Sequence, residues 1–408
     1  MKPVGPIPPG FSSIDGELAI AGYKASDLVA KAGATPLFVY ARELIDHRIG
    51  QLRSALPSRI GVNYALKANP LPAVALHMAG LVDGFDIASS GELAICQRAG
   101  IAADQISFAG PGKRDDELEA AIAAGVTLNC ESSGEAARSL AIADRLGKAP
   151  RIAIRVNPDF ELKGSGMKMG GGAKPFGVDA GKVPDLARHI IAAGAEWRGL
   201  HIFTGSQALS AAAIIEAQAN VLELAAQLSE KIGVPLPKLN LGGGFGIPYF
   251  PGDEPLDLAA IGAALDDRMA SLPALLAHTE FCLELGRYLV GEAGVYLCKV
   301  IDRKESHQVT YLVTDGGLHH QLAASGNFGT VVRRNYPSCI ATRFTEQPTE
   351  EVNIVGCLCT PLDRLADQAL MPPAQPGDLV AIFCAGAYGA SASPSAFLGH
   401  GPAAEILV

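Results

Sequence analysis

Short, strongly apolar runs recur through the first 245 positions and are typical of buried strands. They lie at 37–40, 60–65, 85–89, 106–109, 127–130, 151–156, 200–204 and 239–243. Helical spacing occupies the segments between them, such as 42–55, 114–124 and 210–231. Strands that alternate with helices in this way predict a (β/α)8 barrel of the TIM type over residues 35–280. An open doubly wound sheet is the alternative, although no GxGxxG motif follows the first strand.

The pattern changes after about residue 280. Strand-like runs lie at 295–302, 308–315, 352–356, 378–386 and 405–408, and no long helical segment separates them. This favours an antiparallel β-barrel or sandwich domain formed by residues 281–408 together with the N-terminal residues 1–34. We expect this β domain to complete an active site on the barrel. The Gly- and Lys-rich segment 158–177 is predicted to be a functional lid or a disordered loop.

Composition narrows the class of protein. Of the 408 residues, 49% are hydrophobic, which is enough for a large core and excludes disorder as the main state. The net charge of −9 disfavours bulk nucleic-acid binding. The sequence has no apolar run of membrane-spanning length, and its start lacks the apolar segment of a secretory signal, so we expect a cytoplasmic protein without membrane contact. The eight cysteines are expected to be free thiols, and their spacing predicts no metal site.

Several strand ends carry residues with chemical potential. Lys67 follows an apolar run, where desolvation would make its amine a nucleophile, although it could equally extend to the barrel rim. The run Gly242-Gly243-Gly244 could cradle a phosphate with its backbone amides or be a simple turn. Other candidates are Glu284 and Arg287 in LELGR, His201 in LHIFTGSQ, and Cys359 with Asp363 in GCLCTPLD. Each of these also has a structural reading, as an ion pair, a core histidine or a small apolar residue.

The order of these motifs carries more information than any one of them. The chain resembles the fold type III pyridoxal-phosphate decarboxylases, the family of diaminopimelate, ornithine and arginine decarboxylases. The resemblance runs from about residue 15 to the C-terminus and implies pyridoxal 5'-phosphate as the cofactor. By this likeness Lys67 forms the internal aldimine, Glu284 pairs with the ring nitrogen, and Cys359 protonates the product carbanion. Other positions that the family places near the cofactor are Asp86, Ser89, Glu92, His201, Ser206, Gly242, Gly243, Gly244, Gly286, Arg287 and Tyr388.

In the family, the cysteine reaches in from the neighbouring subunit, so the resemblance also implies a homodimer with shared active sites. The chain departs from the family pattern where the substrate would be read. Phe203 stands where a second histidine usually stacks on the cofactor. Thr360 follows Cys359 where relatives have an acidic residue, so Cys359, Thr360 and Asp363 are the expected substrate contacts. The arginine-rich stretch of diaminopimelate decarboxylases is replaced by HHQLAASGNFG at 319–329.

These changes favour an unusual amino-acid substrate. The variant motifs resemble a subgroup of exosortase A system-associated decarboxylases, which is similar to an enzyme acting on an amino acid tethered to an acyl carrier protein. Such an acidic partner could dock on basic side chains at Lys163, Lys168 and Lys174, or at Arg333, Arg334 and Arg343. Three alternatives stay open: diaminopimelate decarboxylase, a catalytically silent homologue, and a racemase with the same barrel.

Overall fold

The computed structural model describes residues 1–326 and 333–408, and the chain forms two compact units. Residues 49–246 and 255–286 form the first, which we call the barrel unit. Residues 1–48, 247–254 and 287–408 form the second, which we call the β unit.

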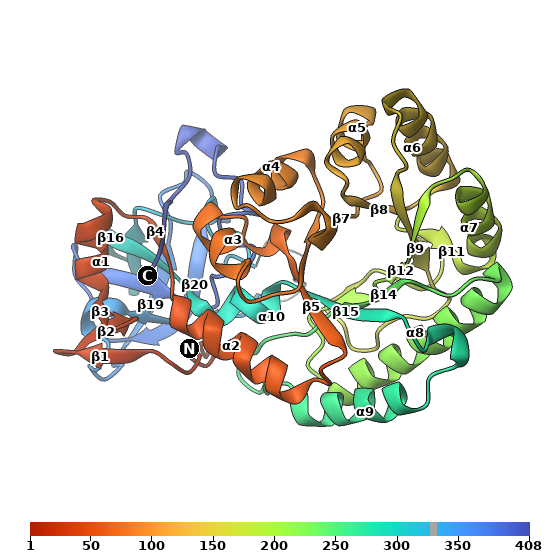
Figure 1. Ribbon diagram of the computed structural model, residues 1–408. Helices are drawn as coiled ribbons and strands as arrows, with labels where there is room; N and C mark the ends of the chain where they lie inside the picture. Colours follow the sequence, from red (N-terminus) through yellow and green to blue (C-terminus); the bar gives the residue numbers. More distant parts are fainter. Residues whose placement is uncertain (327–332) are drawn as a thin grey trace. The chain divides into compact units, whose positions relative to one another are not determined.

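The barrel unit is a closed parallel β-barrel surrounded by helices (Figure 1). Its strands are β5 (Ile60–Ala65), β6 (Gly84–Ile87), β7 (Ile106–Phe108), β8 (Thr127–Cys130), β9 (Arg151–Asn157), β12 (Glu196–Ile202), β14 (Lys238–Gly243) and β15 (Glu280–Leu285). The pairing of β8 with β9 closes the cylinder, and short β11 (Val178–Asp179) extends the edge of β9. The predicted TIM-type barrel is confirmed.

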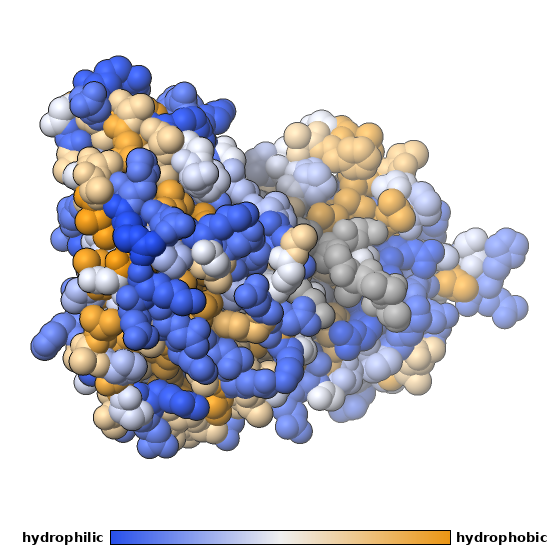
Figure 2. Space-filling model, turned by 90° about the vertical axis from the view of Figure 1, so that its right-hand side faces the viewer, coloured by the Kyte–Doolittle hydropathy of each residue, from blue (hydrophilic) through white to orange (hydrophobic). Residues whose placement is uncertain are grey.

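The helices alternate with these strands. They are α2 (Arg42–Ala55), α3 (Pro72–Met78), α4 (Ser90–Arg98), α5 (Asp115–Ala124), α6 (Ser133–Leu146), α7 (Val183–Ala192), α8 (Ala211–Ile232) and α9 (Leu258–Ala270). Ser89, Ser132 and Ser210 are the N-caps of α4, α6 and α8. Each side-chain hydroxyl accepts a hydrogen bond from a backbone amide of the first turn, which would otherwise lack a partner. Hydrophilic side chains cover most of the face shown in Figure 2, where α7 and α8 lie, as expected of amphipathic helices. No helix in the described ranges is long and apolar enough to cross a membrane.

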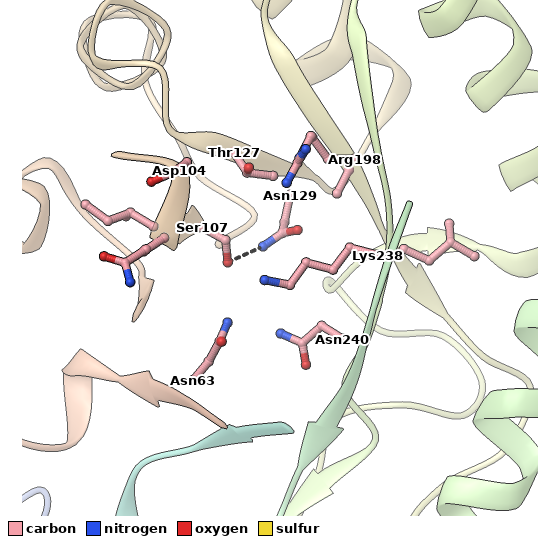
Figure 3. A pocket seen from close by; sticks show the side chains of 12 residues that line it. Asn63, Asp104, Ser107, Thr127, Asn129, Arg198, Lys238 and Asn240 are labelled. Carbon is pink, nitrogen blue, oxygen red and sulfur yellow. Dashed lines mark hydrogen bonds between the residues drawn. The ribbon is translucent and has the colours of Figure 1, made fainter. Parts of the chain in front are cut away.

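The barrel interior contains a polar layer rather than only packed aliphatic residues. Figure 3 shows Asn63, Ser107 and Asn129, each from its own strand, pointing toward Lys238 and Asn240 of β14. The Asn129 amide donates to the Ser107 hydroxyl at 3.1 Å, and that hydroxyl donates to Asp86. The cavity that they line is about 30 Å³, room for one or two water molecules and far too small for a cofactor.

The β unit is built around a mixed, mostly antiparallel sheet with the order β18-β21-β16-β17-β19-β20. The strands are β16 (Gly294–Ser306), β17 (Val309–Thr314), β18 (Ser338–Ile340), β19 (Glu350–Val355), β20 (Arg364–Met371) and β21 (Leu379–Ile382). Strands β4 (Leu37–Tyr40) and β22 (Ala404–Leu407) extend it through β16. The predicted β domain is confirmed, with two parallel pairs, β17 with β19 and β22 with β4.

An N-terminal meander covers one part of this unit. It consists of β1 (Ser12–Ile14), β2 (Glu17–Ile20), β3 (Tyr23–Lys24) and α1 (Ala25–Ala32). Leu18, Ile20 and Leu28 pack there with Val295 and Phe383 in one apolar cluster. The short helix α10 (Arg287–Val290) precedes β16.

One strand assignment made from the sequence was wrong. The run 37–40 is β4, which pairs antiparallel with β16 and parallel with β22, so it belongs to the β unit and not to the barrel. The eighth strand of the barrel is instead β15, which pairs with β14 and β5. Both runs are almost fully buried, and burial gives a strand the same apolar composition in either kind of sheet.

The segment 158–177 is held against the barrel unit at several places. Its short strand β10 (Met167–Lys168) pairs with β13 (Gly205–Ser206). At its end, the Gly177 amide donates to the Glu131 carboxylate, which also accepts from the Arg155 guanidinium at 2.9 Å. The segment is therefore a docked loop over the ends of β9 and β12.

Two glycines in helices of the barrel unit should respond in opposite ways to substitution by alanine. At Gly262, in α9, a Cβ would come within 1.8 Å of the Ala55 carbonyl oxygen, while at exposed Gly50, in α2, no atom lies within 4 Å. We expect Gly262→Ala to destabilise the fold by about 1–3 kcal/mol through overpacking. The matched change Gly50→Ala should stabilise it by about 0.5–1 kcal/mol through helix propensity. Chemical denaturation of both variants checks this, and equal effects would contradict the close approach of α9.

Candidate active site

A buried carboxylate joins two of the predicted residues at the open end of the barrel. Glu284 lies near the end of β15, and its Oε1 accepts from Lys67 Nζ at 3.2 Å. Its Oε2 lies 3.0 Å from His201 Nε2, which donates in the tautomer protonated there. Lys67 sits in the short 3-10 turn that follows β5, and His201 lies on β12, so three strand ends converge on one carboxylate. This is the end of a barrel where reactive groups are found.

The electrostatics hold Glu284 in its charged form. Burial raises the pKa of this carboxyl, but the Lys67 charge and the His201 hydrogen bond lower it more, so it lies well below its usual range. Neighbouring Asp86, at the end of β6, behaves in the opposite way. Burial, and then the charge of Glu284, raise the Asp86 pKa to about 6. Two neighbouring buried carboxyls therefore separate into one with a lowered pKa and one with a raised pKa.

Phe203 lies beside the group formed by Lys67, Glu284 and His201. The Lys67 ammonium lies 5.6 Å from the centre of the Phe203 ring. The hydroxyl oxygens of Ser165 and Ser206 are buried, and among the described residues neither has a hydrogen-bond partner. Ser165 comes from the docked loop, whose amide at Gly166 donates to the Ser206 carbonyl.

The glycine run after β14 is required by backbone clearance. A Cβ at Gly243 would lie 1.9 Å from the Glu284 carbonyl oxygen, and one at Gly244, whose φ is +86°, would lie 2.4 Å from the Gly205 carbonyl oxygen. Gly242, at φ +70°, donates its amide to Asn240. The run therefore brings backbone amides close to Gly205 and Ser206, where orphaned hydroxyls also lie. Such a group of donors without side chains is suited to an anion.

Two other predicted positions next to Lys67 have clear structural reasons. At Gly286, a Cβ would lie 2.9 Å from the Ala68 Cβ, so only glycine fits beside the lysine turn. Ser89 and Glu92 hold the start of α4, where Ser89 is the N-cap. The Ser89 hydroxyl accepts from the Glu92 amide at 3.2 Å, and the Glu92 carboxylate accepts from the Ala88 amide at 2.6 Å.

The remaining cofactor candidates lie in the β unit. Arg287 directly follows Gly286 in the chain and donates to the Tyr249 hydroxyl at 2.6 Å. Its guanidinium lies 4.8 Å from the centre of the Tyr388 ring, and Tyr388 has a positive φ of 59°. Tyr249 was not identified from the sequence, because the run GIPYF that contains it carries no motif. Ser165 was also not identified, because it is a single serine in a Gly-rich loop.

The turn between β19 and β20 carries the predicted substrate contacts. Cys359 is exposed there, and the Thr360 hydroxyl accepts from the Leu362 amide at 3.3 Å. Asp363 is buried, and its two carboxylate oxygens accept from the amides of Leu318 and Leu358 at 2.7 and 2.9 Å. Asp363 thus holds the turn together, while Cys359 presents its thiol to solvent.

Comparison with known proteins decides the family. Residues 42–291 match the pyridoxal binding domain of pyridoxal-dependent decarboxylases. The chain is a fold type III pyridoxal-phosphate-dependent decarboxylase. It is 37% identical to the L-glutamyl-[BtrI acyl-carrier protein] decarboxylase of Niallia circulans, over 93% of this chain and 90% of that one. It is 34% identical to diaminopimelate decarboxylase of Aquifex aeolicus, over 97% and 91% of the two chains.

A solved structure of a relative agrees with this assignment. Diaminopimelate decarboxylase of M. jannaschii in complex with L-lysine superposes with a TM-score of 0.88 at 27% identity, covering 98% of this chain and 93% of that one. As a member of this family, the present chain depends on pyridoxal phosphate, and its own residues fit that group. Lys67 offers an amine beside an ionised carboxylate, and the orphaned Ser206 hydroxyl with the glycine run offers donors to a phosphate.

The raised pKa of Asp86 predicts a pH-dependent stability for the cofactor-free chain. Between pH 3.8 and about 6, the folded chain keeps a proton on Asp86 that the unfolded chain releases. The contribution of Asp86 to the free energy of unfolding therefore falls as pH rises through this window, by at most about 1.4 kcal/mol per pH unit, and is constant above it. Asp86→Asn removes this dependence, so the variant should gain stability relative to wild type from pH 4 to 6.

Denaturant unfolding at several pH values measures the difference. The exposed helix residue Asp144 gives the control, and Asp144→Asn should track wild type throughout. If wild type and Asp86→Asn differ in their free energy of unfolding by the same amount at every pH, the assignment of the proton to Asp86 is contradicted.

Proposed function

We propose that this enzyme decarboxylates an amino acid tethered to an acyl carrier protein, rather than a free diamino acid. The observation that carries the proposal is the contrast between two sets of residues. Lys67, Glu284 and His201 form a complete, connected group. The turn at 356–363, in contrast, has Thr360 where an acidic side chain would read a basic substrate. The relative from Niallia circulans, named for a carrier-bound glutamyl substrate, supports the same conclusion.

The roles we propose within the site follow from its electrostatics. When bound, pyridoxal phosphate supplies a carbonyl that takes up an amine and a ring that accepts the electron pair left by departing CO2. Lys67 holds the cofactor through its amine, and the ionised Glu284 holds a proton on the ring nitrogen. His201 fixes the Glu284 carboxylate through Oε2, and Phe203 covers the ring face. Ser206, Gly242, Gly243, Gly244, Gly286, Arg287 and Tyr388 are proposed to bind the phosphate.

Cys359 is proposed as the acid that delivers a proton to the substrate carbon after CO2 loss, with Thr360 beside it at the substrate. Asp363 acts through the turn, since both of its oxygens are occupied by backbone amides. We also propose a homodimer in which Cys359 serves the site of the neighbouring subunit. The exposure of Cys359 in the single chain supports this arrangement.

The basic side chains considered for carrier docking are mostly engaged within the chain. Lys163 pairs with Glu216 at 2.6 Å, and Arg343 pairs with Asp378 at 2.9 Å. The Arg334 guanidinium stacks over Phe250 at 3.6 Å, and Arg333 donates to the Arg364 carbonyl. The side chain of Lys168 lies outside those that the structure describes. Membership of the exosortase-associated subgroup rests on the sequence motifs alone and stays part of this proposal.

CO2 release from a substrate panel tests the proposed function. The cofactor-loaded enzyme is given free diaminopimelate, lysine, ornithine, arginine and glutamate, and glutamate loaded on an acyl carrier protein. We expect release only from the carrier-bound substrate, and none from Lys67→Ala, which lacks the amine. Strong turnover of free diaminopimelate would instead identify a diaminopimelate decarboxylase. No turnover of any substrate by a protein that binds the cofactor would favour a silent homologue.

Mixing inactive variants tests the shared site. Lys67→Ala and Cys359→Ala chains are each expected to be inactive or strongly impaired. After subunit exchange, one of the two sites in each mixed dimer would have both residues intact, so about a quarter of wild-type activity should return at equal mixing, since half of the dimers are mixed. Exchange is confirmed with differently tagged chains. Mixed dimers without restored activity would show that Cys359 acts within its own chain.

A further inference from the structure

Three side chains from separate segments of the β unit meet in a cluster unrelated to the cofactor residues. They are His319 after β17, Cys357 after β19 and His400 before β22. One donor atom from each lies within 4.8 Å of the other two. The Cys357 sulfur lies 4.0 Å from both ring nitrogens of His400, and the rings of His319 and His400 are 5.0 Å apart between centres.

His319 gives an independent sign that a ligand belongs here. Its side chain is 0% exposed, and among the described residues neither Nδ1 nor Nε2 has a hydrogen-bond partner. Buried polar atoms are nearly always satisfied, and a fully buried imidazole with both nitrogens unsatisfied is costly. One nitrogen of His319 directed at a metal ion would remove half of this cost.

The backbone around the cluster is fixed by a buried carboxylate. Asp363 accepts from the amide of Leu318, which precedes His319, and from the amide of Leu358, which follows Cys357. A Cβ at Gly317 or Gly356 would come within 2.2 Å of this carboxylate, so both glycines allow the close approach. Asp363 therefore holds two of the three donor residues at a set separation.

A second link fixes the third segment. His320 Nε2 lies 2.9 Å from the Gly401 carbonyl oxygen, next to His400, and its Nδ1 lies 3.1 Å from the Tyr296 hydroxyl. With Nε2 protonated, His320 donates to Gly401 and accepts from Tyr296. The segment that carries His400 is thus tied to the residue after His319. Metal ligands are held in place by such outer contacts in known sites.

We propose that His319, Cys357 and His400 form a binding site for Zn²⁺. Two imidazoles and one thiolate are the donor types that zinc takes in tetrahedral sites, with about 3.5 Å between neighbouring nitrogen and sulfur ligands. His400 is exposed, so its side chain can rotate to shorten the present 4.0 Å separation from the Cys357 sulfur. On binding, the Cys357 thiol, which now donates to the Asp315 carbonyl, releases its proton to solvent.

Water fills the fourth position of this site. Cys357 lines a groove of about 590 Å³ with Tyr311, Val313 and Thr360, which gives the ion and a water access from solvent. The bound ion would link three segments of the β unit, one of them two residues from Cys359. The cysteine spacing could not predict this site, because its donors are one cysteine and two histidines that lie 38 or more residues apart.

Zinc content of the full-length, cofactor-loaded enzyme tests the proposal. The protein is treated with a chelator, dialysed against Zn²⁺, freed of loose metal by gel filtration, and analysed for zinc per chain. We expect one ion per chain, a higher Tm with zinc than without, and a cobalt–thiolate absorption band when Co²⁺ replaces Zn²⁺. Cys357→Ser and His400→Ala should each weaken zinc binding about tenfold or more and abolish the cobalt band.

Matched controls separate this site from other donors. Cys359→Ser removes the neighbouring thiol, and His278→Ala removes an exposed histidine of the barrel unit; both should retain zinc and the cobalt band. His319→Gln should also lose zinc, but it changes a fully buried residue, so the Cys357 and His400 variants decide. Wild-type enzyme that retains no zinc, or variants of Cys357 and His400 that retain as much as wild type, would overturn the proposal. These readouts do not depend on the identity of the amino-acid substrate.

Discussion

The site depends on keeping one buried carboxylate ionised. Glu284 is 5% exposed, and a carboxylate in that position would normally take up a proton. Lys67 and His201 prevent this by occupying one oxygen each. The barrel supplies the geometry, because β5, β12 and β15 end at the same edge and present the three side chains inward. A change in the length of any of these strands would separate the group.

The neighbouring Asp86 shows what Glu284 would be without its partners. Asp86 is equally buried, but it accepts from the Ser107 hydroxyl, which in turn accepts from the Asn129 side chain. Neither carries charge, so the pKa of Asp86 rises to about 6. The polar layer of the barrel interior therefore provides hydrogen bonds but no positive charge close enough to ionise Asp86 fully. The two buried carboxyls differ in pKa because Glu284 bonds directly to Lys67 and His201, whereas Asp86 bonds to a neutral hydroxyl.

The sequence predicted the barrel and the β domain, and it singled out Lys67, Glu284 and His201 as separate candidates, because strand-end motifs are local. The hydrogen bonds that join them through Glu284 came only from the structure. The sequence misplaced β4, since a fully buried run of four apolar residues suits either sheet. It also missed Tyr249 and Ser165, whose positions follow from how loops return to the strand ends. The cluster of His319, Cys357 and His400 was invisible for the same reason, because its donors meet only through tertiary contacts.

Asp363 explains how the side chains of the turn at 356–363 can vary while its backbone keeps its path. Its carboxylate fixes the backbone at Leu318 and Leu358, so the turn at 356–363 and the segment after β17 keep their spacing whatever side chains they carry outward. Cys359 is exposed on this fixed frame, whereas the Thr360 hydroxyl accepts from the Leu362 amide within the turn. Substitutions at such positions alter what is bound without the cost of rebuilding the turn. Because Asp363 holds the backbone through its carboxylate, a residue such as Thr360 can differ from the family pattern without a change in the path of the turn.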